Sequence, residues 1–153
     1  MVSSLCICRI VSGGQTGVDR AALDAAIWLG IPHGGWCPKG RRAEDGPIPE
    51  RYDLEETDES QYFIRTERNV IDSDATLILY EVELTGGTAL TLRMAKKHQK
   101  PCLQVDLTQL PTFDEMLQWL AEEQVATLNV AGPRESSCPG IGEESRQLLV
   151  DLL

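Results

Sequence analysis

Apolar and polar residues follow two alternating patterns along this chain, which predict strands and helices in turn. Runs of apolar and β-branched residues predict strands at 5–11, 75–80, 101–105 and 127–130. Apolar residues at helical spacing predict helices at 18–29, 61–72, 85–97, 112–123 and 142–153. Because parallel strands are joined by right-handed crossovers, the sequence predicts an α/β fold with a mostly parallel sheet flanked by helices.

Residues 31–53 interrupt this alternation. The segment is rich in proline and glycine, so we expect a loop without regular structure. A loop of this length inside a compact domain is usually functional or disordered. Trp36, Ile48 and Tyr52 favour an ordered loop, and residues 54–57 are a candidate short strand.

The carboxyl ends of parallel strands meet at one edge of a sheet, where such folds bind ligands. The loops that begin at Ser12, Glu81 and Ala131 each follow a predicted strand. We therefore expect these three loops to meet at one site.

The first of these loops is rich in glycine. Its glycines let the backbone adopt positive φ and approach a ligand, so that N–H groups at the start of the next helix face an anion. The spacing matches neither the dinucleotide-binding nor the Walker pattern. We expect phosphate binding, with a tight strand-to-helix connection as the alternative, at Ser12, Gly13, Gly14, Gln15, Thr16 and Gly17.

A second glycine-rich segment at the start of a predicted helix is also suited to bind an anion. Thr85, Gly86, Gly87 and Thr88 offer backbone N–H groups and hydroxyls to an anion. Arg134 adds a cation at the same edge. We expect Gly13, Gly14 and Gly87 to lack side chains because the phosphate lies against the backbone itself.

Cations gather in the segment 37–46. Lys39, Arg41 and Arg42 lie among glycines there, and a phosphate suits them because arginine grips it bidentately. The alternative is a solvated loop whose cations pair with its own carboxylates. Cys37 is either a thiol activated by Lys39 or a structural cysteine.

The helix predicted at 61–72 has two distinct faces. Its apolar face consists of Phe63, Ile64, Val70 and Ile71. A polar stripe consists of Tyr62, Arg65, Thr66 and Asn69, and spacing alone does not decide whether it faces a ligand or water.

Composition narrows the functional classes. The 14 basic and 24 acidic residues give a net charge of −10, which disfavours nucleic-acid binding. Five cysteines without a C-x-x-C pair indicate a reduced, cytoplasmic protein, and Cys6 and Cys8 share one strand face that we expect to be buried. The length suits a single domain covering residues 1–153.

Several kinds of site are not indicated. No apolar run is long enough to span a membrane, and the N-terminus lacks the pattern of a signal peptide. The histidines His33 and His98 belong to no hydrolase or zinc motif. The sequence therefore indicates a binding cleft more clearly than a reaction centre.

Taken together, the motifs resemble those of the family called putative molybdenum carrier proteins. The similarity spans almost the whole chain and rests on residues 12–19, 37–41, 43–46, 65–66, 69–70, 73–78, 85–88 and 129–136. The resemblance implies a single Rossmann-like three-layer domain, related in fold to Lonely Guy phosphoribohydrolases and DNA-processing protein A. It also implies a homo-oligomer that binds molybdenum cofactor or a related phosphorylated pterin or nucleotide.

Two rival functions follow from the wider resemblance. Lonely Guy enzymes carry P-G-G-x-G-T-x-x-E, whereas residues 85–91 lack the proline, the following glycine and the glutamate. These differences favour a carrier, with a nucleotide-processing enzyme of that type as the alternative. Gly17-Val18-Asp19 is similar to the G-I-D of DNA-processing proteins, but the net charge argues against single-strand binding.

Overall fold

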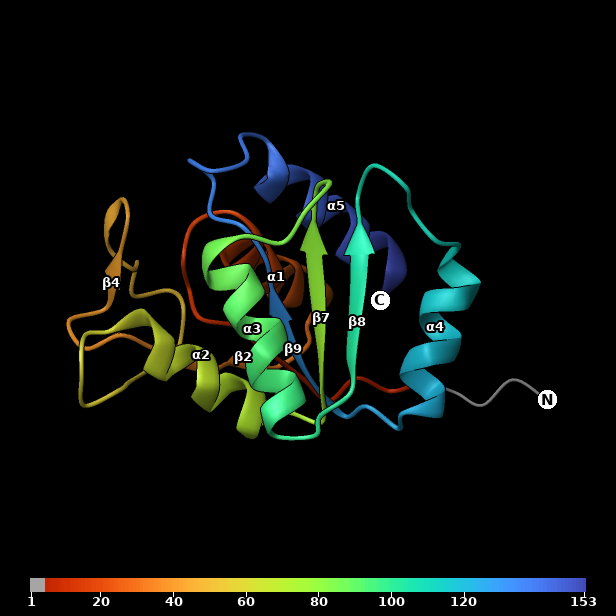
Figure 1. The fold of residues 1–153 in the computed structure, drawn as a ribbon, viewed down its shortest axis with the longest axis horizontal. Helices are drawn as coiled ribbons and strands as arrows, with labels where there is room; N and C mark the ends of the chain where they lie inside the picture. Colours follow the sequence, from red (N-terminus) through yellow and green to blue (C-terminus); the bar gives the residue numbers. More distant parts are fainter. Residues whose placement is uncertain (1–4) are drawn as a thin grey trace.

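A computed structural model describes residues 5–153, and its framework is a parallel sheet between two layers of helices (Figure 1). The five strands of this sheet lie in the order β2-β1-β9-β7-β8, and every neighbouring pair is parallel. Their bounds are β1 Arg9–Val11, β2 His33–Gly34, β7 Ala75–Tyr80, β8 Cys102–Asp106 and β9 Thr127–Ala131. The fold is the expected α/β, Rossmann-like arrangement.

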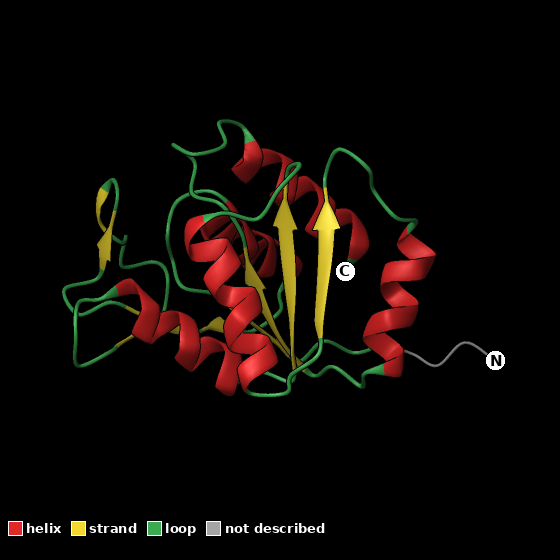
Figure 2. Cartoon of the chain, viewed as in Figure 1, coloured by secondary structure: helices red, strands yellow, loops and turns green. Residues whose placement is uncertain are grey.

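Helices cover both faces of the sheet. In Figure 1, α3 lies in front of the strands while α1 and α5 lie behind them. The helix bounds are α1 Val18–Leu29, α2 Tyr62–Ile71, α3 Gly86–Lys97, α4 Phe113–Glu122 and α5 Ile141–Leu152. Because all the strands of the sheet run the same way (Figure 2), the loops that follow β1, β7 and β9 lie at one edge.

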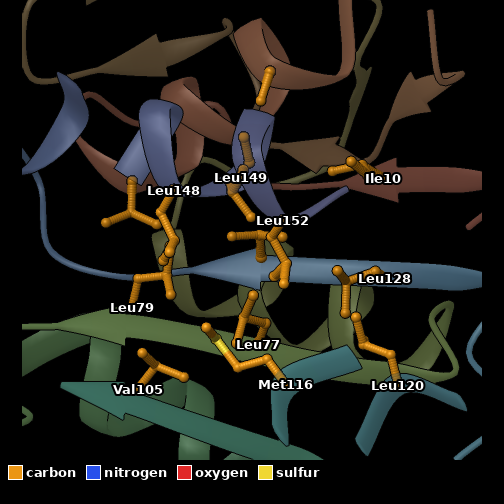
Figure 3. Packing of buried hydrophobic residues seen from close by; sticks show 14 of the residues in the cluster. Ile10, Leu77, Leu79, Val105, Met116, Leu120, Leu128, Leu148, Leu149 and Leu152 are labelled. Atoms are coloured by element: carbon orange, nitrogen blue, oxygen red, sulfur yellow. The ribbon is translucent and has the colours of Figure 1, made fainter. Parts of the chain in front are cut away.

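The main core lies between the sheet and the layer of α1, α4 and α5. Leu77 and Leu128 from the sheet pack there with Met116, Leu120 and Leu149 from the helices (Figure 3). All five side chains are at most 1% exposed. Their burial removes apolar surface from water and holds the strand ends in place.

The segment 31–53 contains short pieces of regular structure, contrary to our expectation. β2 adds an edge strand to the main sheet, and the others in the segment are β3 Trp36–Cys37, β4 Arg42–Ala43 and β5 Gly46–Pro47; β6 Glu55–Glu56 follows it. β3 pairs in parallel with β6, which lies within the expected short strand, and β4 forms a hairpin with β5. A second core cluster that includes Ile48 and Tyr52 orders the segment.

Two expectations about burial were wrong. Cys6 and Cys8 are exposed, since Leu5 and Ile7 are the residues of that stretch that pack against the core. The first strand begins only at Arg9, where pairing with β9 starts. On α2 the expected apolar face is buried only in part: Val70 is fully buried, but Phe63 is 50% exposed, whereas Arg65 of the polar stripe is 8% exposed.

Candidate functional site

A polar cavity of about 390 Å³ lies at the edge of the sheet where the strands end. The loop after β1, the inner face of α2, the start of α3 and the segment after β9 all contribute to it. Its lining includes Gly13, Gln15, Asp19, Arg65, Thr66, Asn69, Thr85, Gly86, Gly87, Thr88, Thr91, Asn129, Arg134, Ser136 and Ser137. The expected meeting of three loops is therefore present, and α2 forms a fourth wall.

The start of α3 gives the cavity a region suited to anions. The first N–H groups of a helix have no acceptor within it, and the helix dipole favours negative charge there. Thr85 is the N-cap residue but makes no side-chain capping bond. A Cβ on Gly86 or Gly87 would meet nothing within 4 Å, so the space beside both residues is open.

Arg65 is a nearly buried cation in the wall of the cavity. Its Nη1 donates to the carbonyl of Gly13 at 2.6 Å, and its Nε donates to Thr66 Oγ1 at 3.3 Å. A Cβ on Gly13 would collide with this guanidinium. Gly13 therefore lacks a side chain because Arg65 occupies that space, a reason that the sequence alone did not indicate.

Gln15 and Asp19 form the wall beneath the loop after β1. Gln15 is 5% exposed, and its Oε1 accepts from the N–H groups of Thr16 (3.0 Å) and Glu44 (2.9 Å). Its Nε2 has no partner among residues 5–153. Asp19 accepts from Gln15 N–H at 3.3 Å, and its burial raises its pKa to about 6 although Arg65 lowers it.

Three other residues of the first loop were expected at the site: Ser12, Gly14 and Gly17. Ser12 Oγ donates to the carbonyl of Asp19 at 2.7 Å. A Cβ on Gly14, which has φ of 80°, would lie 2.7 Å from Leu54 Cδ1, so this glycine packs against the second core cluster rather than a ligand. Gly17 is also at positive φ, and a Cβ there would collide with the carbonyl of Pro133.

Glu44 ties three loops together at this edge. It accepts hydrogen bonds from the hydroxyls of Thr16 and Ser136 and from Ser136 N–H at 3.2 Å. The bonds from Ser136 and Thr16 lower the pKa of Glu44. Thr16 Oγ1 in turn accepts from Glu135 N–H at 3.1 Å. Thr16, which we expected to contact a ligand, instead links two loops.

Two cations of the basic segment, Lys39 and Arg41, do not reach the cavity as we expected. Arg41 donates instead to the carbonyls of Ile48, Pro49, Leu54 and Tyr52, at 2.8–3.4 Å. Its positive charge stabilises the turns of the segment, because this arrangement satisfies four backbone acceptors at once. Lys39 is exposed, and neither residue lines the cavity.

The polar stripe of α2 faces inward. Asn69 lines the cavity, but its side chain is already paired with the backbone of Trp36: Oδ1 accepts from N–H at 2.8 Å and Nδ2 donates to the carbonyl at 3.0 Å. It therefore holds β3 against α2. The ring of Tyr62 lies among guanidinium groups of Arg42, Arg65 and Arg134, at 4.5, 5.2 and 5.6 Å.

Several lining residues were absent from the expected set: Asp19, Thr91, Asn129, Ser136 and Ser137. Asn129 lies on β9, between β1 and β7, and donates to Thr76 Oγ1 at 3.1 Å. A polar residue inside an apolar strand was the available signal for Asn129. Thr91 follows Thr88 by one helical turn, and its Oγ1 donates to the carbonyl of Gly87 at 2.9 Å.

Two kinds of feature are absent from residues 5–153. No group of three His, Cys, Asp or Glu side chains is arranged to hold a metal ion in that range. Among the same residues, no helix has both the length and the apolar character needed to cross a membrane.

Comparison with known proteins relates this geometry to a family. The model of the circularly permutated YpsA SLOG family matches residues 10–153. A crystal structure of a "putative molybdenum carrier protein" from Syntrophus aciditrophicus SB is 47% identical, with a TM-score of 0.94, over 97% of this chain and 96% of that one. No curated protein matches. The chain belongs to the circularly permutated YpsA SLOG family.

Proposed function

We propose that this protein binds a small phosphate-bearing molecule in the cavity at the carboxyl edge of the sheet. The observation that carries the proposal is the joining of two anion-favouring features in one cavity, the start of α3 and the buried guanidinium of Arg65. In a chain with net charge −10, such a concentration of positive potential favours a small anion. The residues proposed to contact it are Gly13, Gln15, Arg65, Gly86, Gly87, Thr88 and Arg134.

The ligand that we propose is molybdenum cofactor or a related phosphorylated pterin or nucleotide. A 47% identical protein bears the name of a molybdenum carrier, and the polar cavity of about 390 Å³ is of a size that takes a small organic molecule. The protein would bind and deliver this ligand without transforming it. We propose a cytoplasmic location from the five free cysteines, and self-association remains a prediction that light scattering tests.

The alternative is a nucleotide-processing enzyme. Asp19 is the one carboxylate among the described residues that line the cavity. The glutamate of the Lonely Guy motif is missing from α3, where Thr91 lines the cavity instead. The pKa of about 6 would let Asp19 exchange a proton near neutral pH. Release of free base from nucleoside monophosphates, measured by chromatography and lost in Asp19→Asn, would establish this alternative.

Mass spectrometry of small molecules released from the protein tests the carrier proposal. The protein is purified under reducing, anaerobic conditions, together with Arg134→Ala and the control Arg68→Ala, whose arginine stacks on Trp36 outside the cavity. We expect a phosphorylated pterin or nucleotide from the unmodified protein and from the control, and less from Arg134→Ala. Equal recovery from all three proteins, or no phosphorylated compound, would contradict the proposal.

A further inference from the structure

Three arginines from separate segments gather around one aromatic ring at the side of the cavity. Arg42 comes from β4, Arg65 from α2 and Arg134 from the segment after β9, and their guanidinium carbons lie 4.5–5.6 Å from the centre of the Tyr62 ring. We call these three residues and Tyr62 the arginine cluster. Attraction to the ring offsets part of the repulsion among three like charges.

Acidic side chains of the described residues neutralise this cluster only in part. The salt bridges within residues 5–153 involve Arg20, Lys97, His98 and Arg146, but no arginine of the cluster. Asp19 and Glu44 act on it electrostatically. Glu44 already accepts bonds from Thr16 and Ser136, so three cations face two carboxylates of which one is otherwise engaged.

Two of the three arginines of the cluster are held in place before any ligand arrives. Arg65 is 8% exposed and bonded to Gly13, and Arg42 Nη2 donates to the carbonyl of Ser60 at 2.7 Å. Arg65 and Arg134 line the same cavity as Gly86 and Gly87. A fixed guanidinium binds a phosphate-type anion with little loss of conformational entropy.

The cavity therefore has two places that favour an anion, the start of α3 and the side where Arg65 and Arg134 of the arginine cluster line it. A ligand with one phosphate group neutralises one of them and leaves the other without a counterion. The Nε2 of Gln15, in the wall of the same cavity, is a further donor that has no acceptor among residues 5–153. Building on the proposed function, we propose that the natural ligand carries two anionic groups, as an organic diphosphate does, with the second group at the arginine cluster.

Calorimetric titration with inorganic phosphate and with pyrophosphate, at one ionic strength, tests this inference. We expect the unmodified protein to bind pyrophosphate at least ten times more tightly than phosphate. Arg42→Gln, which removes one exposed cation of the cluster, should weaken pyrophosphate binding at least three times more than phosphate binding. Thermal melts establish that the variants are folded.

Arg68→Gln is the matched control. It removes the same charge, but from an arginine that stacks on Trp36 at 4.8 Å instead of on Tyr62. We expect it to keep the full preference for pyrophosphate, which separates the cluster from the general effect of a more highly charged probe. Equal affinity for phosphate and pyrophosphate, or an equal loss of preference in Arg42→Gln and Arg68→Gln, would overturn the inference of a second anionic group. The proposed function would still stand. No saturable binding of either probe would overturn both.

Discussion

At the residue scale, the glycines of the two helix starts have different neighbours. Gly14 has φ of 80° and packs against Ile48 and Leu54, whereas Gly87 lies beside open space in the cavity. The methyl group of an alanine would therefore contact protein atoms at position 14 but would enter the open cavity at position 87. Similar sequence motifs thus place glycine for two physical reasons.

We expect Gly14→Ala to lower the free energy of unfolding by about 1–3 kcal/mol, through positive φ and contact with Leu54 Cδ1. Gly87→Ala should unfold at or slightly above the normal temperature, because alanine favours a helix and has free space there. Thermal melts with and without pyrophosphate compare them. Gly14→Ala should keep its ligand-induced rise and Gly87→Ala should lose most of it; the reverse pattern would place the ligand elsewhere.

Asp19 predicts a pH dependence. Burial raises its folded-state pKa to about 6 from an ordinary value of 3.8, so the folded protein binds more protons between these values. Its contribution to stability therefore falls as pH rises from about 4 to about 6, by roughly 3 kcal/mol at about 1.4 kcal/mol per pKa unit, and is constant above that. We expect the stability of Asp19→Asn relative to the unmodified protein to grow across this range in urea titrations. A difference independent of pH would contradict this assignment.

At the element scale, periodicity predicted the helices well and burial less well. The spacing of apolar residues placed α1 and β7 at their observed bounds, since both patterns are local. The partners of α2 lie far away in sequence: Arg65 bonds to Gly13 and Asn69 to Trp36, so its polar stripe turned inward while Phe63 stayed exposed. The local sequence pattern cannot predict hydrogen bonds between residues so far apart in the chain.

Arg41 shows that the same limit applies to the prediction of site residues. The sequence offered a cation among glycines, a pattern shared by phosphate ligands and by loop-forming arginines. Which role applies depends on carbonyls of residues 48–54, whose positions follow from the folded segment. The two glycine-rich starts, by contrast, were located correctly at the edge of the sheet because strand ends fix them.

We expect Arg41→Ala to lower the free energy of unfolding by about 2 kcal/mol or more, because several backbone carbonyls lose a charged donor. Pyrophosphate affinity should stay unchanged. Lys39→Ala, in the same segment but exposed, is the control and should affect neither quantity. Chemical unfolding and calorimetry measure the two effects; a stable Arg41→Ala protein with weakened binding would return Arg41 to the ligand site.

At the scale of the whole molecule, the site depends on loops that are distant in sequence and fastened to one another. Glu44 joins the loop after β1 to the segment after β9 through Thr16 and Ser136, and Arg20 pairs with Asp45 beside it at 3.0 Å. The segment 31–53 therefore acts as a bridge between two walls of the cavity. Through Glu44 it fixes Ser136, two residues after Arg134, relative to the first loop.

Glu44→Gln should loosen this bridge, because the amide retains one acceptor oxygen and replaces the other with a donor. We expect faster hydrogen exchange at the backbone N–H of Ser136, which now donates to Glu44 at 3.2 Å, and weaker pyrophosphate binding. Since the pKa of Glu44 is lowered in the folded state, its contribution is present above the ordinary value of 4.5 and is lost as pH falls. Glu50→Gln, in an exposed part of the same segment, is the control; equal exchange in both variants would contradict the bridging role.

The central claim is that anions bind in the cavity that the start of α3 and Arg65 line. Nuclear magnetic resonance of the labelled protein, titrated with pyrophosphate, tests it residue by residue. We predict saturable shifts of the backbone N–H signals of Gly86, Gly87 and Thr88 and of the Nε–H signal of Arg65, with little change at Gly40 and Arg41. Saturable shifts confined to residues 39–42, with those of α3 unchanged, would contradict the account.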